Sequence, residues 1–240
     1  MVRMRRLLPL ALLLLLVACA QQQTIVPTPP PAPTLPMVAE VLAAPTPGRL
    51  TVVGILYMTP EGAALSDQLQ LGTNETTPLD GQAIWLGAPP ALATATPRAD
   101  AAQPSYLIVE ASGNLIGPGT YGPAGRYRYA LDQPTLAVRT VRDLSIPLLL
   151  ANSTLYEGQP VRLQGQLLAS PSLVLLVERL GAGGVPNDRA LQVKLAAPPR
   201  DPALSAALHT SANGRTTFGP IELTGLWRSG SLYPLTAIPR

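Results

Sequence analysis

An internal repeat constrains the fold of this chain more than any other feature of its 240 residues. Three short segments recur in the same order, each at an offset of about 110 residues. Because the segments share both their order and nearly their spacing, they indicate a tandem duplication. The pairs are GILYMTP (54–60) with GQLLASP (165–171), IWLGAPP (84–90) with VKLAAPP (193–199), and VEASG (109–113) with IELTG (221–225).

Both copies consist largely of short apolar runs separated by Gly, Pro and Asn, a pattern typical of β-strands. Only residues 201–209 (DPALSAALH) predict a helix, because Asp201 suits an N-cap and Pro202 suits a first turn. The strands are predicted at 50–58, 63–71, 82–86, 106–111, 126–131 and 136–141 in the first copy, and at 161–168, 172–180, 191–195, 218–226 and 232–238 in the second.

The order of these elements resembles the OB-fold, a small five-stranded barrel with its helix between strands three and four. The mid-strand glycines Gly54 and Gly165 suit a first strand that bends to join both halves of such a barrel. The resemblance implies an all-β protein with two tandem OB-like barrels, at residues 48–147 and 148–240. A pair of β-sandwich modules is the alternative. The first copy departs from the pattern, since its segment at 91–103 carries a proline and no apolar stripe.

The N-terminus resembles a bacterial lipoprotein signal peptide, predicted at residues 1–18. Three arginines precede an apolar run that is shorter than the roughly 20 residues a membrane-spanning helix needs. The run ends in Leu16-Val17-Ala18-Cys19, which is similar to the lipobox, and Cys19 is the only cysteine of the chain. The resemblance implies cleavage before Cys19, lipidation of its sulfur and a location outside the cytoplasm on a bacterial membrane. A secretory signal with a free cysteine and an uncleaved membrane anchor are the alternatives.

Removal of the signal peptide changes the charge of the protein. The whole chain has 17 basic and 14 acidic residues and a formal charge of +3. Arg3, Arg5 and Arg6 account for this excess, so the mature chain is neutral. Nucleic-acid binding rests largely on neutralising phosphates, and we therefore expect no nucleic-acid partner. Residues 19–47 are rich in proline and predict an extended linker after the lipidated cysteine.

The sequence has few residues suited to catalysis, and we predict that the protein is not an enzyme. Its one histidine, His209, lies at the end of the predicted helix, with no cysteine near it that would suggest a metal site. No nucleophile elbow and no phosphate-binding glycine motif is found, and the acidic residues are scattered singly. We therefore expect no cofactor and no metal.

One stretch, around residues 120–142, suggests a ligand-binding surface. In strand geometry Arg126 and Arg128 point to one face while Tyr127 and Tyr129 point to the other. Arg139 lies on the strand predicted to pair beside them after a turn at DQP. Arginines beside tyrosines on a small barrel suit an anionic or sugar ligand. The alternative is an exposed sheet face whose arginines are solvated or paired with nearby acids, of which Glu110 is one.

These features favour a lipid-anchored binding or scaffold protein of the bacterial envelope, with a glycan or another envelope protein as its partner. A hydrolase that uses only carboxylates and a purely structural spacer are the alternatives. Glu110 and Glu222 occupy matching positions in the two copies, either as a shared functional carboxylate or as outward-facing residues of an alternating strand.

Overall fold

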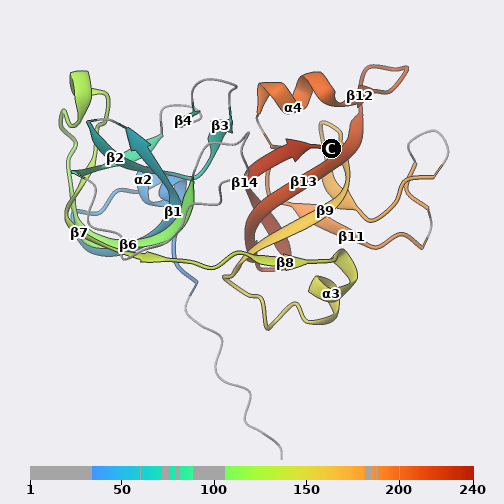
Figure 1. Ribbon diagram of the computed structural model, residues 1–240, viewed down its shortest axis with the longest axis horizontal. Coiled ribbons are helices and arrows are strands. Elements are labelled where there is room, and N and C mark those ends of the chain that lie inside the picture. The colour runs from blue at the N-terminus through green and yellow to red at the C-terminus, as the bar shows by residue number, and fades with distance from the viewer. Residues whose placement is uncertain are drawn as a thin grey trace, which may run out of the picture. The chain divides into compact units, whose positions relative to one another are not determined.

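The computed structural model describes residues 34–240 except 60, 72–75, 79–81, 89–105, 182–184, 188 and 200. Residues 31–240 form one compact unit. The described part is all-β, with two barrels that follow one another in the sequence and a few short helices (Figure 1). None of its helices has the length and apolar composition that crossing a membrane requires. The predicted signal peptide, the lipobox and Cys19 lie outside the described residues.

The first barrel is closed, with the strand order β1-β2-β5-β7-β6 and a final pairing of β6 with β1. All of its pairings are antiparallel except the one between β5 and β7. A separate two-stranded sheet of β3 and β4 accompanies it. The strands are β1 (Gly48–Thr59), β2 (Gly62–Ser66), β3 (Leu69–Leu71), β4 (Thr76–Pro78), β5 (Ala83–Gly87), β6 (Leu107–Ile116) and β7 (Ala130–Val138).

The second barrel repeats this arrangement with the order β9-β10-β11-β14-β13, closed by pairing of β13 with β9. Its third and fifth strands, β11 and β14, are again parallel. The short strands β8 and β12 extend its sheet at β9 and β13. The strands are β8 (Arg142–Leu144), β9 (Pro160–Ala169), β10 (Val174–Val177), β11 (Gln192–Leu195), β12 (His209–Thr210), β13 (Thr217–Arg228) and β14 (Ser231–Pro239).

The strand order 1-2-3-5-4-1 with parallel third and fifth strands confirms two OB-like barrels, and the β-sandwich alternative is wrong. The predicted helix is confirmed as α4 (Pro202–Ala207), which lies between the third and fourth strands of the second barrel. In both barrels alternate residues of the strands point inward, and each interior is filled by its own aliphatic cluster.

A short helix before each barrel was not predicted. Helix α2 (Val38–Ala43) precedes β1, and α3 (Ile146–Ala151) precedes β9. The first residue of each helix, Val38 or Ile146, is buried in the adjacent barrel. The prediction of a linker extending to residue 47 is therefore wrong for the residues around α2, because their apolar side chains are packed in the first barrel.

These helices explain the mid-strand glycines. A Cβ on Gly54 would lie 2.9 Å from the Ser66 carbonyl oxygen and 3.1 Å from Val38 Cγ2. A Cβ on Gly165 would lie 2.8 Å from the Val177 carbonyl oxygen and 3.2 Å from the Cδ1 atom of Ile146. The two barrels therefore share the same close approach of strand and helix, as a tandem duplication predicts.

A second pair of glycines marks the bulges of the fourth strands. A Cβ on Gly113 would lie 2.8 Å from the Asp132 carbonyl oxygen, and one on Gly225 would lie 2.5 Å from that of Tyr233. The register shifts at both places. Glycine is needed here because the neighbouring backbone passes where a side chain would begin.

The hairpin predicted for residues 126–141 is wrong. Residues 130–138 form one continuous strand, β7, which pairs along its length with β6. The DQP segment is a bulge inside this strand, and Gln133 adopts a left-handed φ of 49° there. A proline within a strand is compatible with such a bulge because the bulge leaves a backbone position without a ladder hydrogen bond. Residues 126–129 belong to the loop before β7.

We predict that Gly54→Ala lowers the free energy of unfolding by about 1–3 kcal/mol, because the added methyl group meets a backbone oxygen that has no room to move. Urea unfolding followed by tryptophan fluorescence measures this change. The control is Gly181→Ala, whose Cβ would be 3.4 Å from the nearest atom, and which should change stability by less than about 0.5 kcal/mol. Equal stability of both variants would refute the role assigned to Gly54.

Candidate functional site

The loop between β6 and β7 of the first barrel comprises residues 117–129, and we call it the Tyr/Arg loop. It joins the fourth and fifth strands, and this is one of the two loops with which OB-folds bind their ligands. Backbone hydrogen bonds in both directions between Tyr121 and Tyr127, of 2.9 and 3.1 Å, fold it into a small hairpin. The loop therefore has a defined conformation.

Trp85 of β5 holds this loop on the barrel. Its backbone N–H donates to the Tyr129 carbonyl at 3.0 Å, and its ring lies 5.1 Å from that of Tyr127. Gly62 and Gly122 leave room for the indole, since a Cβ on either would lie within 3.0 Å of it. Tyr57 and Tyr121 complete the cluster. Trp85, Tyr57 and Tyr121 remain partly exposed and form an aromatic surface beside the loop.

The arginines and tyrosines of the loop alternate as predicted, although the segment is not a strand. Arg126 and Arg128 are exposed, Tyr127 is buried and Tyr129 is half-buried against the barrel core. Burial raises the pKa of the Tyr127 hydroxyl above its ordinary value. Within the described part of the chain neither arginine forms an ion pair. Their guanidinium groups are available to a ligand.

The second barrel lacks this loop. Its β13 and β14 are joined by the tight turn Ser229–Gly230, where both residues have positive φ. Arg228, beside the turn, donates to both carboxylate oxygens of Glu40 in α2 at 3.0 and 3.1 Å and lies 5.1 Å above the Tyr233 ring. The end of the second barrel that corresponds to the Tyr/Arg loop is therefore used for contact with the first barrel.

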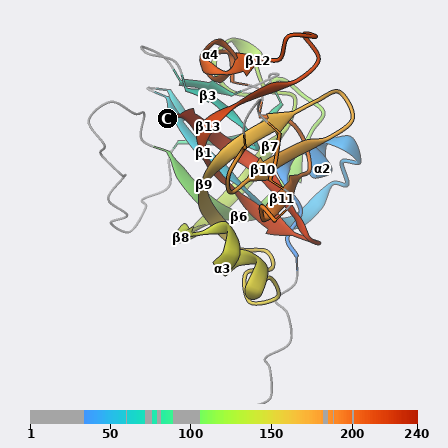
Figure 2. The ribbon, with the colours of Figure 1, turned by 90° about the vertical axis from the view of Figure 1, so that its right-hand side faces the viewer.

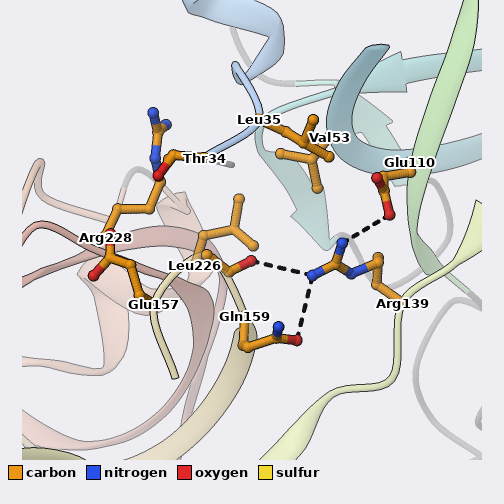
Figure 3. A pocket seen from close by; sticks show the side chains of 10 residues that line it. Thr34, Leu35, Val53, Glu110, Arg139, Glu157, Gln159, Leu226 and Arg228 are labelled. Atoms are coloured by element: carbon orange, nitrogen blue, oxygen red, sulfur yellow. Dashed lines mark hydrogen bonds and ion pairs between the residues drawn. The ribbon is translucent and has the colours of Figure 1, made fainter. Parts of the chain in front are cut away.

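Arg139, predicted to lie beside the other arginines, is at a different place (Figure 3). Its Nη1 donates to Glu110 Oε2 at 2.7 Å, while Nη2 donates to the carbonyl of Gly158 and to Gln159 Oε1, both at 3.3 Å. The first partner belongs to the first barrel, and the others immediately precede β9. Arg139 therefore connects the two barrels and does not extend the Tyr/Arg surface, because β7 does not turn back at DQP.

A small pocket of about 120 Å³ opens beside Arg139. Figure 3 shows that both barrels contribute to it, with Arg139 and Arg228 among the charged side chains around it. These charged groups already have partners within the protein, since Glu110 binds Arg139, Arg228 binds Glu40, and the Glu157 carboxylate accepts the Ser229 N–H at 2.9 Å. The pocket is lined by Thr34, Leu35, Val53, Glu110, Arg139, Glu157, Gly158, Gln159, Leu226 and Arg228.

The ion pair of Arg139 has an equivalent in the second barrel. Arg240 follows β14 as Arg139 follows β7, and it binds Glu222, the counterpart of Glu110. The backbone N–H groups of the two arginines also donate to equivalent carbonyls, those of Ile108 and Pro220. The matching glutamates are therefore outward-facing residues that fix the end of the fifth strand. Only Arg139 also reaches the other barrel.

The two barrels also share an apolar contact. Outward-facing side chains of β1 and β6 pack with outward-facing side chains of β13 and β14. At one side of this contact Tyr106 and Thr236 share a hydrogen bond of 3.0 Å between their hydroxyls. The buried members of this cluster are Met37, Val53, Ile55, Ile108, Leu226 and Leu235.

Asp67 was not identified from the sequence. Its carboxylate accepts the backbone N–H groups of Val38 and Ala39 at 2.7 and 2.6 Å, at the start of α2. Burial raises its pKa to about 6, although these two hydrogen bonds act in the opposite direction. It lines a cavity of about 250 Å³ that also contains Glu40. Asp67 joins α2 to β2, and no spacing in the sequence indicates this contact across 28 residues.

The other predictions for functional groups concern isolated residues. His209 begins β12 and is exposed, with its ring 5.7 Å from that of Phe218. Among the residues described, no three His, Cys, Asp or Glu side chains are grouped so that they could hold a metal ion.

Comparison with known proteins gives no assignment. No protein-family model matches the chain, and no curated protein and no solved structure matches it significantly.

We predict that Arg139→Met uncouples the unfolding of the two barrels and lowers stability by about 1–3 kcal/mol, because Glu110 and Gln159 lose a shared charged donor. Each barrel contains one of the two tryptophans, Trp85 or Trp227. Urea unfolding in the single-tryptophan backgrounds Trp85→Phe and Trp227→Phe therefore reports each barrel separately. The midpoints should coincide with Arg139 present and separate in the variant.

The matched control is Arg240→Met. Arg240 is half-exposed, and Arg162 still neutralises Glu222 when Arg240 is removed. This variant should cost less than about 1 kcal/mol and leave the two midpoints together. If Arg139→Met also leaves them together, the apolar contact and the Arg228–Glu40 pair couple the barrels without Arg139.

Proposed function

We propose that the chain is a non-enzymatic, lipid-anchored binding or scaffold protein of the bacterial envelope, and that the Tyr/Arg loop of the first barrel receives its ligand. The observation that carries this proposal is the pair Arg126 and Arg128, which are exposed and without ion pairs among the described residues, on a loop held by Trp85. Their position matches the place where OB-folds bind ligands.

The difference between the two barrels supports this assignment. In the second barrel the corresponding turn has only two residues, and Arg228 beside it binds Glu40 of the first barrel. One barrel therefore carries an accessible loop while the other uses the same end for packing. A duplicated domain with this asymmetry suits a protein in which one barrel binds and the other supports it.

The chemistry of the loop favours an anionic ligand that contains sugar rings. A guanidinium group matches a carboxylate or phosphate with two parallel hydrogen bonds. The partly exposed rings of Tyr57, Trp85 and Tyr121 offer flat apolar faces of the kind that stack on sugars. Polysaccharides of the cell envelope combine both features, and a protein anchored through Cys19 would lie within reach of them.

We predict that the double variant Arg126→Ala/Arg128→Ala weakens binding to an anionic envelope polysaccharide by about tenfold or more, because each charged hydrogen bond contributes about 1.5–3 kcal/mol. Its melting temperature should remain unchanged, since neither arginine forms an ion pair with a described residue. Affinity is measured by calorimetry or by binding to immobilised polysaccharide. The control Arg189→Ala/Arg215→Ala removes two exposed arginines of the second barrel and should leave affinity unchanged.

Parallel loss of binding and of melting temperature would refute the binding role. Two further experiments separate the alternatives. Absence of any ligand across a glycan array and in pull-downs would favour a structural spacer. Turnover of an envelope polymer that is lost on substitution of a single carboxylate would favour a hydrolase.

We predict that cells expressing the protein incorporate a palmitate analogue into it and that Cys19→Ser abolishes this label, because Cys19 is the only thiol available for acylation. Gel fluorescence after coupling the analogue to a dye measures the incorporation. Label that persists in Cys19→Ser would refute the anchor.

A further inference from the structure

We propose that residues 146–156, comprising α3 and the turns after it, form a second contact with the lipid surface, in addition to the acyl anchor. We call these residues the α3 segment. The inference rests on the proposed anchor at Cys19. It adds a surface of the folded part that would touch the membrane and would orient the barrels on it.

The α3 segment exposes apolar side chains without charges among them. Residues 144–156 contain no Asp, Glu, Lys, Arg or His. Leu155 is 69% exposed and Leu148 is 45% exposed, which makes Leu155 the most exposed large apolar side chain of the described residues. Leucines that project from an uncharged segment are suited to shallow insertion between lipid headgroups.

The segment is held firmly enough to keep these leucines outside. Ile146 and Leu149 are buried in the core of the second barrel. Ser145 caps α3 by accepting the Leu148 N–H at 3.3 Å, and Trp227 Nε1 donates to the Ser153 carbonyl at 3.0 Å. Because the buried side chains fix the segment from one side, Leu148 and Leu155 cannot turn into the core.

The chain enters the folded part next to this segment. Thr34, the first described residue, lines the same pocket as Glu157, Gly158 and Gln159, which follow the α3 segment directly (Figure 3). Figures 1 and 2 show α3 at the lower end of the fold, on the side where the described chain begins. Fifteen residues connect Cys19 to Thr34 and span at most about 50 Å. An anchor at Cys19 therefore allows the α3 segment to reach the membrane.

The charges around the segment are compatible with a lipid surface. Glu157 accepts the Ser229 N–H at 2.9 Å, and Asp143 is paired with Arg162 at 2.8 Å. Arg142, exposed at the start of β8, adds a positive charge that anionic headgroups attract. Two exposed leucines are too few for a stable contact between copies of the chain, which needs about 800 Å² on each partner. The observations therefore favour lipid as the partner that the α3 segment contacts.

The test uses the full-length, acylated chain on vesicles of phosphatidylethanolamine and phosphatidylglycerol that contain a headgroup-depth quencher. An environment-sensitive fluorophore is attached to Leu155→Cys, which is the only free thiol when Cys19 is acylated. Leu173→Cys is the reference, because Leu173 is also exposed but lies beyond the opposite end of β9 from the α3 segment. We expect the label at 155 to be quenched several-fold more than the label at 173, and Leu148→Asp to reduce this difference.

Equal quenching at the two positions, or none at 155, overturns the contact. Energy transfer between labels on different copies without lipid quenching also overturns it, since the segment would then contact protein. Acylation of Cys19 is measured by mass spectrometry of the same sample. An acylated chain without selective quenching refutes the contact and leaves the anchor intact. A chain that is not acylated refutes the anchor; the comparison is then repeated with Cys19→Ser, so that position 155 or 173 carries the single thiol, and selective quenching at 155 supports the contact.

Discussion

Closure of each barrel depends on glycines at places where two backbone segments nearly touch. Gly54 and Gly165 let the first strands bend past the second strands and leave room for Val38 and Ile146, the first residues of the preceding helices. A side chain there would separate the strand from its neighbour or displace the helix from the core. The helices, the cores and the attachment of the second barrel all depend on this geometry.

The two barrels contact each other through faces that are not equivalent. On the first barrel Val53 and Ile55 of β1 face outward and pack against the second barrel. The corresponding residues of β9 are Gln164 and Gln166, so this face is polar on the second barrel where it is apolar on the first.

The difference between the barrels also separates their proposed tasks. The Tyr/Arg loop is accessible on the first barrel, whereas the corresponding turn of the second barrel supports the contact through Arg228. Arg139 adds a second link between the barrels. With the α3 segment on lipid, these links would hold the loop at a fixed orientation to the membrane. Binding by a fixed surface loses less conformational entropy than binding by a flexible one.

Periodicity and repeat spacing by themselves determined the fold class, most of the strands and helix α4, because strand alternation and turn residues are local signals. They also indicated that Arg126 and Arg128 lie on the opposite face from Tyr127, and the structure showed that the arginines are exposed and Tyr127 is buried. The lipid anchor at Cys19 remains a prediction from the sequence. Tertiary structure decided that DQP is a bulge, that Arg139 connects the barrels, and that Asp67 holds α2. Each of these depends on contacts between distant segments, and the sequence carries no local pattern that encodes which segments meet.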